Sequence, residues 1–155
     1  MSYRISGLAP EGFARWFGQP DAVLAAAGVV RVRADAKPGY PCRVTLEDAE
    51  PGETLLLFHH VDHDVATPFR NGFAIFVREG AAQAARYEDS LPPVLADRAI
   101  ALRGYAADGM LRTAVLMEPG KVEEGIRTLF AREDVAYIHA HNAAYGCFAA
   151  RIERS

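Results

Sequence analysis

The 155-residue chain has few cysteines and no long apolar stretch. A membrane-spanning helix needs about 20 consecutive, mostly apolar residues, and no segment approaches that length. The first residues also lack the apolar core and the small-residue cleavage site of a secretory signal. These absences predict a cytoplasmic protein with no membrane contact. In that reducing compartment the only two cysteines, Cys42 and Cys147, are expected to be free thiols.

Strong charge of either sign is also lacking. The formal net charge is -3, and the 17 basic residues, nearly all arginine, are scattered among 20 acidic ones. A protein that binds nucleic acid usually gathers its basic residues into a patch or stripe that follows the phosphates. We therefore expect no nucleic-acid partner.

The composition is that of an ordinary globular protein, with 50% hydrophobic and 24% charged residues. A chain of this length buries roughly 70% of its unfolded surface on folding, which is enough for one core. No linker, internal repeat or low-complexity segment divides the sequence. We expect a single domain over residues 1–155.

Strands dominate the predicted secondary structure. Segments with β-branched residues or period-two alternation cover residues 29–34, 43–46, 54–60, 73–78, 99–105, 110–117, 135–141 and 146–153. Helices are predicted at 10–18, 21–27 and 119–132, and residues 81–86 have helical character, although Pro92 and Pro93 prevent a continuous helix there. Asp108-Gly109 marks a hairpin, and 54–60 is the best candidate for a central strand. The pattern predicts an α+β fold, a mostly antiparallel sheet with a few helices packed on it.

The histidines suggest one shared polar face. His139 and His141 alternate along the strand 135–141 and should project with Tyr137 from the same side. If His141 stands opposite Cys147 in a hairpin of the last two strands, His139 stands opposite Ala149. The other face of that hairpin would then be apolar, filled by Ile138, Phe148, Ala150 and Ile152.

This face permits a metal site. Imidazoles together with a thiolate or a carboxylate are typical ligands of zinc and other transition metals. The candidates are His139, His141, His60 and Cys147, with Asp62 or Asp64 nearby in the sequence. No His-Glu-x-x-His and no Cys-x-x-Cys is present, so structural histidines are the alternative. The sequence identifies no cofactor.

A catalytic cysteine is another hypothesis. Cys147 or Cys42 could act as a nucleophile if a histidine such as His141 favoured its thiolate and Asn142 or Tyr145 oriented a substrate. The alternative is that both thiols are small buried hydrophobes, which is common for a cysteine between apolar neighbours.

Three arginines lie in or beside strand-like segments: Arg43, Arg78 and Arg103. A guanidinium that emerges from a sheet can hold a carboxylate or a phosphate with two parallel hydrogen bonds. The alternative is that each arginine pairs with one of the many acidic residues at the sheet edge. No glycine-rich phosphate loop and no nucleophile-elbow serine accompanies them.

Several short segments of the sequence together resemble a bacterial family of unknown function, DUF1203. These segments are Gly39-Tyr40-Pro41-Cys42-Arg43, Asp48-Ala49-Glu50-Pro51-Gly52-Glu53, Pro68-Phe69, Ile75-Phe76-Val77-Arg78, Leu102-Arg103-Gly104-Tyr105, His139-Ala140-His141-Asn142 and Tyr145-Gly146-Cys147-Phe148. The resemblance implies a compact bacterial domain of about this length, and it implies no activity, substrate or catalytic residue.

Two hypotheses follow, and they leave open whether the protein is an enzyme. In the first, a pocket binds a small molecule, which could be an anion. The pocket is lined by Arg43, Arg78, Arg103, His139, His141, Asn142 and Tyr145, with Cys42 and Cys147 beside them. In the second, the chain is a noncatalytic interaction or structural module that forms a homodimer through an exposed patch of Tyr40, Phe69 and Phe73.

Overall fold

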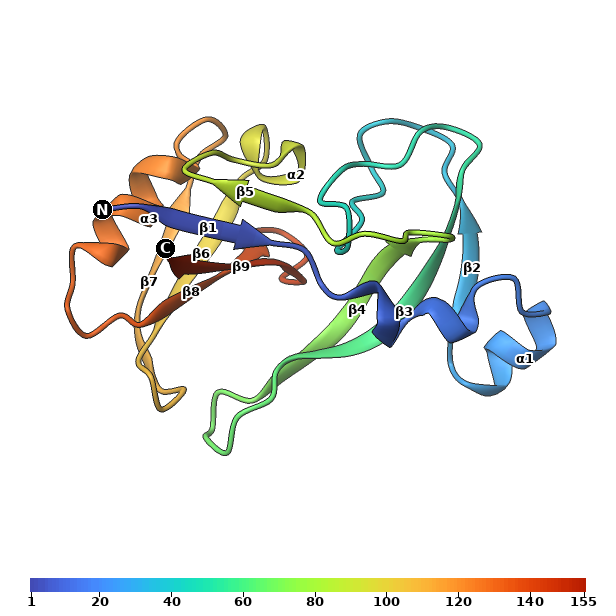
Figure 1. The fold of residues 1–155 in the computed structure, drawn as a ribbon, viewed down its shortest axis with the longest axis horizontal. Coiled ribbons are helices and arrows are strands. Elements are labelled where there is room, and N and C mark those ends of the chain that lie inside the picture. The colour runs from blue at the N-terminus through green and yellow to red at the C-terminus, as the bar shows by residue number, and fades with distance from the viewer.

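The computed structural model describes residues 1–155 and contains two antiparallel sheets (Figure 1). The larger sheet has six strands in the order β5 (Arg86–Glu88), β1 (Tyr3–Ser6), β9 (Phe148–Arg154), β8 (Tyr137–Asn142), β6 (Ile100–Tyr105) and β7 (Leu111–Met117). The smaller sheet has three strands, in the order β2 (Val30–Arg33), β3 (Thr54–His63) and β4 (Asn71–Arg78). The predicted central strand is confirmed, because β3 lies between β2 and β4.

The helices are short and few, and the α+β prediction is confirmed. They are α1 (Asp21–Ala26), α2 (Pro93–Ala96) and α3 (Val122–Phe130), with two 3-10 turns at Pro10–Gly12 and Ala14–Trp16. In Figure 1, α3 packs against the larger sheet and α1 lies beside the smaller one. None of the helices has both the length and the apolar character needed to cross a membrane.

One face of the larger sheet holds the main core. The predicted apolar stripe of α3 is confirmed, since Ile126 and Leu129 are buried against that face. Leu102 of β6, Ile138 of β8 and Ile152 of β9 point into the same core. Because side chains alternate along a strand, the neighbouring residues of β6, β8 and β9 must project from the opposite face.

The opposite face is polar and aromatic, and the end of β3 packs against it. The His63 imidazole at the end of β3 hydrogen-bonds the Tyr137 hydroxyl of β8, with 2.6 Å between Nε2 and the oxygen. In the loop that follows β3, the Thr67 hydroxyl donates to the carbonyl of Gly109 in the β6–β7 turn, at 3.2 Å. The β3–β4 hairpin therefore belongs to the smaller sheet but covers the polar face of the larger one.

The predicted register of the last hairpin is wrong. His139 lies opposite Arg151 rather than Ala149, and His141 lies opposite Phe148 rather than Cys147, with an irregularity between Ala140 and His141. A tight turn displaces the pairing, because Gly146 takes a positive φ of 77° and its N–H donates to the carbonyl of Asn142.

This irregularity changes which face Phe148 occupies. Its ring packs on the imidazole of His139, with 5.0 Å between the ring centroids, and so joins the polar face. Ile138, Ala150 and Ile152 are in the apolar core, as the sequence predicted.

Three local predictions are also wrong. Residues 43–46 form a turn, closed by the Leu46 N–H donating to the carbonyl of Cys42, and not a strand. Residues 81–86 contain no helix, and residues 10–18 form two 3-10 turns instead of one helix. Residues 81–86 instead contact a distant part of the chain, where the Ala85 N–H donates to the carbonyl of Val44.

Candidate functional site

A cavity of about 710 Å³ lies between the two sheets and the β8–β9 turn. Most of its wall is apolar. Its lining residues are Gly39, Tyr40, Pro41, Arg43, Leu57, Phe73, Ala74, Phe76, Arg98, Ala99, Asn142, Ala143, Ala144, Tyr145 and Cys147. Tyr145 is 82% exposed and Phe73 is 50% exposed, so these two rings stand at the solvent side of the cavity. The volume falls in the range of roughly 300–1,000 Å³ that is typical of small-molecule sites.

A sulfur atom with two N–H donors lies in the wall of this cavity. The Arg43 guanidinium donates from Nη2 to Sγ of Cys147 at 3.1 Å, and the Asn142 side-chain amide donates to the same sulfur at 3.3 Å. Cys147 is 9% exposed. Two N–H donors, one of them cationic, are therefore directed at one sulfur.

Arg43 is unusual because it is a buried cation with no carboxylate partner. Its remaining hydrogen bonds go to two backbone carbonyls, from Nε to Phe148 at 2.8 Å and from Nη1 to Pro41 at 2.6 Å. Only 2% of the residue is exposed. Burial lowers the pKa of Arg43, and the nearby sulfur of Cys147 opposes that effect. Cys147 is thus the only ionisable acceptor that this guanidinium contacts.

The second arginine of the cavity is already paired. Arg98 donates to the Asp48 carboxylate from both terminal nitrogens, at 3.0 and 2.5 Å. Burial would raise the pKa of Asp48, but the hydrogen bonds and charge of Arg98 outweigh it and hold that pKa below its usual value. This ion pair makes Arg98 a structural part of the wall and leaves Arg43 as the guanidinium without a carboxylate.

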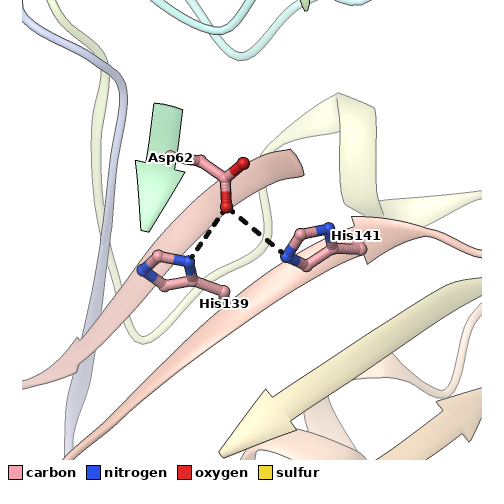
Figure 2. A group of neighbouring side chains, drawn as sticks. All are labelled: Asp62, His139 and His141. Carbon is pink, nitrogen blue, oxygen red and sulfur yellow. Dashed lines mark ion pairs between the residues drawn. The ribbon is translucent and has the colours of Figure 1, made fainter. Parts of the chain in front are cut away.

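A second polar cluster lies on the covered face of the larger sheet (Figure 2). Asp62 reaches from β3 toward two imidazoles of β8, as Figure 2 shows. Its Oδ2 lies 3.8 Å from Nδ1 of His139 and 4.0 Å from Nε2 of His141. The three side chains are at most 1% exposed. His139 and His141 were predicted metal candidates, with Asp62 or Asp64 as the acid, and the structure brings Asp62 and the two histidines together.

The charges in this cluster follow from its burial. Burial lowers the pKa of His139, and it lowers the pKa of His141 to about 4, so both imidazoles are neutral near pH 7. Burial would raise the pKa of Asp62, but the neighbouring His139 and His141 and the amide of Asn71 outweigh it and lower that pKa. The cluster therefore contains one carboxylate and two neutral imidazoles.

The remaining predicted residues lie outside the cavity and the histidine cluster, or at their margins. Arg78 pairs on the surface with Glu53, at 2.7 Å, and with Glu47. Arg103 lies opposite His139 in the β6–β8 pairing, and its charge contributes to the lowered pKa of His141. The structure thus divides the predicted pocket into a cavity, a buried histidine cluster and a surface ion pair.

Two further candidates have other surroundings. The Cys42 sulfur is fully buried and accepts the backbone N–H groups of Thr45 and Arg78, at 3.4 and 3.2 Å. The His60 ring is half-buried between aromatic rings, 5.9 Å from that of Phe13. Neither residue belongs to the cavity or to the histidine cluster.

The three aromatic residues expected at a homodimer patch have different surroundings. Tyr40 and Phe73 line the cavity, whereas Phe69 is half-buried and its carbonyl contacts the His63 ring at 2.9 Å. Sequence reasoning missed Arg98, because nothing in the local sequence shows that it lines the cavity or that it pairs with Asp48, 50 positions away.

The comparisons with known proteins give a family. The profile of a family described as "Protein of unknown function (DUF1203)" matches residues 39–154. The chain belongs to the DUF1203 family. The resemblance in the sequence is therefore confirmed. The matched range of this DUF1203 chain contains both the contact between Arg43 and Cys147 and the histidine cluster. No curated protein and no solved structure matches it. Its function has to be argued from the chemistry of the site.

Proposed function

We propose that the chain binds a small molecule in the 710 Å³ cavity and that Cys147 is the nucleophile that faces the bound molecule. The observation that carries this proposal is the contact between the buried Arg43 guanidinium and the Cys147 sulfur, at 3.1 Å. A cytoplasmic location, as the sequence predicts, would supply the reducing conditions in which such a thiol stays free.

The argument for a thiolate is electrostatic. An unpaired charge is costly inside a protein, and a buried ion needs a counterion and hydrogen bonds. Arg43 has hydrogen bonds from three of its nitrogens, and its one ionisable partner is Cys147. Deprotonation of Cys147 would give this guanidinium its counterion, and the thiolate is the form of cysteine that attacks electrophiles.

The walls indicate the class of ligand. Apolar and aromatic side chains favour a molecule with a flat or aliphatic body, for example between Tyr40, Phe73 and Phe76. A guanidinium has five N–H groups, and three of those of Arg43 are used within the chain. The other two are free to bind an oxygen of a ligand. We therefore favour an apolar-bodied molecule with an electrophilic carbon near a carbonyl or carboxylate oxygen.

Two chloroacetamide probes with the same reactive group test this function. The Cys147 thiolate attacks the carbon that bears chlorine, so a C–S bond forms, the C–Cl bond breaks and chloride leaves. We expect the labelling rate of N-benzyl-2-chloroacetamide to saturate with concentration, because its ring first occupies the cavity, and that of 2-chloroacetamide to rise linearly. Peptide mapping by mass spectrometry locates the label.

The reference for this experiment is a short cysteine peptide, which shows the intrinsic reactivity of both probes. The proposal predicts that the benzyl probe gains at least tenfold over 2-chloroacetamide on the folded protein, relative to the peptide. If the two probes react with Cys147 in the same ratio as with the peptide and neither rate saturates, the cavity does not bind the ring and the proposed function is wrong.

A further inference from the structure

The Asp62, His139 and His141 cluster lies at the seam between the two sheets and takes no part in the proposed cavity chemistry. Its carboxylate oxygen is 3.8 and 4.0 Å from the two imidazole nitrogens. These separations exceed the roughly 2.7–3.2 Å of a hydrogen bond to nitrogen, although the three groups face one another. Something other than a direct hydrogen bond must therefore satisfy them.

Three imidazole nitrogens in this cluster have no hydrogen-bond partner. They are Nδ1 and Nε2 of His139 and Nε2 of His141, all of them buried. Buried polar atoms are nearly always paired, because each unpaired one costs free energy. Two of these atoms, Nδ1 of His139 and Nε2 of His141, face the Asp62 carboxylate. The cluster thus offers two nitrogen lone pairs and one carboxylate to a common point.

The surrounding hydrogen bonds orient these groups as in a metal site. Nδ1 of His141 lies 2.9 Å from the carbonyl of Gly146, which fixes the proton on that nitrogen and leaves the lone pair on Nε2. The Asn71 amide donates to both oxygens of Asp62, at 2.8 and 3.1 Å. Metal ligands typically have such partners, a carbonyl behind the imidazole and a donor to the carboxylate.

We propose that Asp62, His139 and His141 bind one divalent transition-metal ion, with zinc as the first choice. Zinc ligands lie about 2.0–2.2 Å from the ion, so two of them can be at most roughly 4.2 Å apart. The separations of 3.8 and 4.0 Å meet this limit, and all three ligand atoms lie within 4.8 Å of one another, so a small rotation of one imidazole completes the set. A donor set of two neutral imidazoles and a carboxylate suits zinc.

The burial of the site assigns it a structural role. Each ligand side chain is at most 1% exposed, so a substrate cannot reach an ion held there. Asp62 belongs to the smaller sheet and the two histidines to the larger one, so the ion joins β3 to β8. Nδ1 of His141 also hydrogen-bonds the carbonyl of Gly146, the residue before Cys147. The ion therefore stabilises both the contact between β3 and β8 and the β8–β9 turn that contains Cys147.

The test is the metal content of untagged protein purified without chelator, before and after addition of Zn²⁺ or Co²⁺. We expect about one ion per chain in the wild type and at least a tenfold loss of affinity in Asp62→Ala, His139→Ala and His141→Ala. The matched control is His59→Ala, which replaces an exposed histidine on β3, the strand of Asp62. This variant should retain the ion. Bound Co²⁺ should also give a visible absorption band that responds to these ligand substitutions.

Asp62→Asn and His139→Gln keep the size of the side chains and serve if the alanine variants do not fold. The ion should raise the melting temperature of the wild type, and it should raise that of these variants much less. Failure of the wild type to bind Zn²⁺ or Co²⁺ at micromolar concentrations overturns the proposal. Loss of the ion in Cys147→Ser, with retention in His141→Ala, would also overturn it. Labelling of Cys147 is read separately, so the two proposals can fail independently.

Discussion

The guanidinium of Arg43 and the sulfur of Cys147 lie 3.1 Å apart, although 104 positions separate the two residues in the chain. Arg43 sits in a turn that is bonded to β4 through its own N–H and the Phe76 carbonyl, and Cys147 sits in the β8–β9 turn. The contact therefore forms only when both sheets have assembled. Arg43 also bonds the Phe148 carbonyl, so one buried cation ties the small sheet to the large one and forms part of the cavity wall.

The first prediction concerns the aromatic rim of the cavity. Phe73→Ser removes an apolar ring from the cavity wall and should weaken the saturable labelling by N-benzyl-2-chloroacetamide several-fold, while leaving the rate with 2-chloroacetamide unchanged. Leu116→Ser, at a 70% exposed leucine on β7 outside the cavity, is the matched control and should alter neither rate. Equal effects of the two substitutions would show that the ring does not bind beside Phe73.

The second prediction concerns the two thiols. Cys42 is fully buried and packed in the core of the smaller sheet, whereas Cys147 borders the cavity. Under native conditions 2-chloroacetamide should label Cys147 at least tenfold faster than Cys42, and both should react alike after unfolding in guanidinium chloride. Peptide mapping measures the two rates in one sample. Faster labelling of Cys42 in the native protein would contradict the assignment of the nucleophile.

The third prediction is a stability effect at Gly7, where the chain passes close to two other backbone segments. A Cβ at this position would overlap the carbonyl oxygen of Val44 and lie 3.1 Å from the backbone nitrogen of Ala85. Because backbone cannot move aside as a side chain can, Gly7→Ala should cost at least about 2 kcal/mol of unfolding free energy. Gly12→Ala is the control, since a Cβ there meets nothing within 4 Å. Urea unfolding that gives equal stabilities for both variants would contradict this packing.

The fourth prediction is a pH dependence that arises at Glu79. Hydrogen bonds from Arg31 lower the pKa of Glu79 to about 2, with further bonds from Gly18 and Thr54, whereas the unfolded-state value is near 4.5. A carboxyl group whose pKa is depressed by folding stabilises the folded state fully above its unfolded pKa, and this contribution is lost as the pH falls through the folded pKa.

Glu79→Gln should therefore lower the unfolding free energy at pH 7 by about 1 kcal/mol, or roughly 2–4 °C in melting temperature. The difference from the wild type should shrink as the pH falls from 4.5 toward 2. Thermal unfolding followed by circular dichroism measures it. A difference that stays constant over this range would mean that the ion pair with Arg31 does not set the pKa of Glu79.

The sequence was sufficient for the fold class because its strands and helices carry strong periodicity. The hairpin of β6 and β7 was marked by Asp108-Gly109, and α3 by its apolar stripe, so both follow from local patterns. The register of β8 and β9 did not, since it depends on the irregularity next to His141. The turn at residues 43–46 has a strand-like composition, but its backbone is bonded to Phe76 and Ala85, far away in the sequence.

The sequence named Arg43, Cys147 and the two histidines as candidates, but it did not group them as the structure does. Strand alternation placed His139 and His141 on one face, and the sequence also named Asp62 as a ligand candidate. Which acid meets these histidines is decided by how the β3–β4 hairpin crosses the larger sheet, and no local signal encodes that crossing. The partner of Cys147 was missed for the same reason, because a histidine was expected where Arg43 donates to the sulfur.

The most direct test of the proposed function is the rate at which 2-chloroacetamide labels Cys147 at pH 7 in the wild type, Arg43→Lys and Arg43→Met. Circular dichroism and melting temperature confirm that each variant is folded. Asn142→Ala, which removes the second donor to the sulfur, is the substitute variant if the Arg43 variants do not fold. If Arg43 stabilises the thiolate, the rate falls at least tenfold in Arg43→Met and less in Arg43→Lys or Asn142→Ala. If folded Arg43→Met reacts as fast as the wild type, the contact between Arg43 and Cys147 does not activate the thiol, and Cys147 is an ordinary structural cysteine.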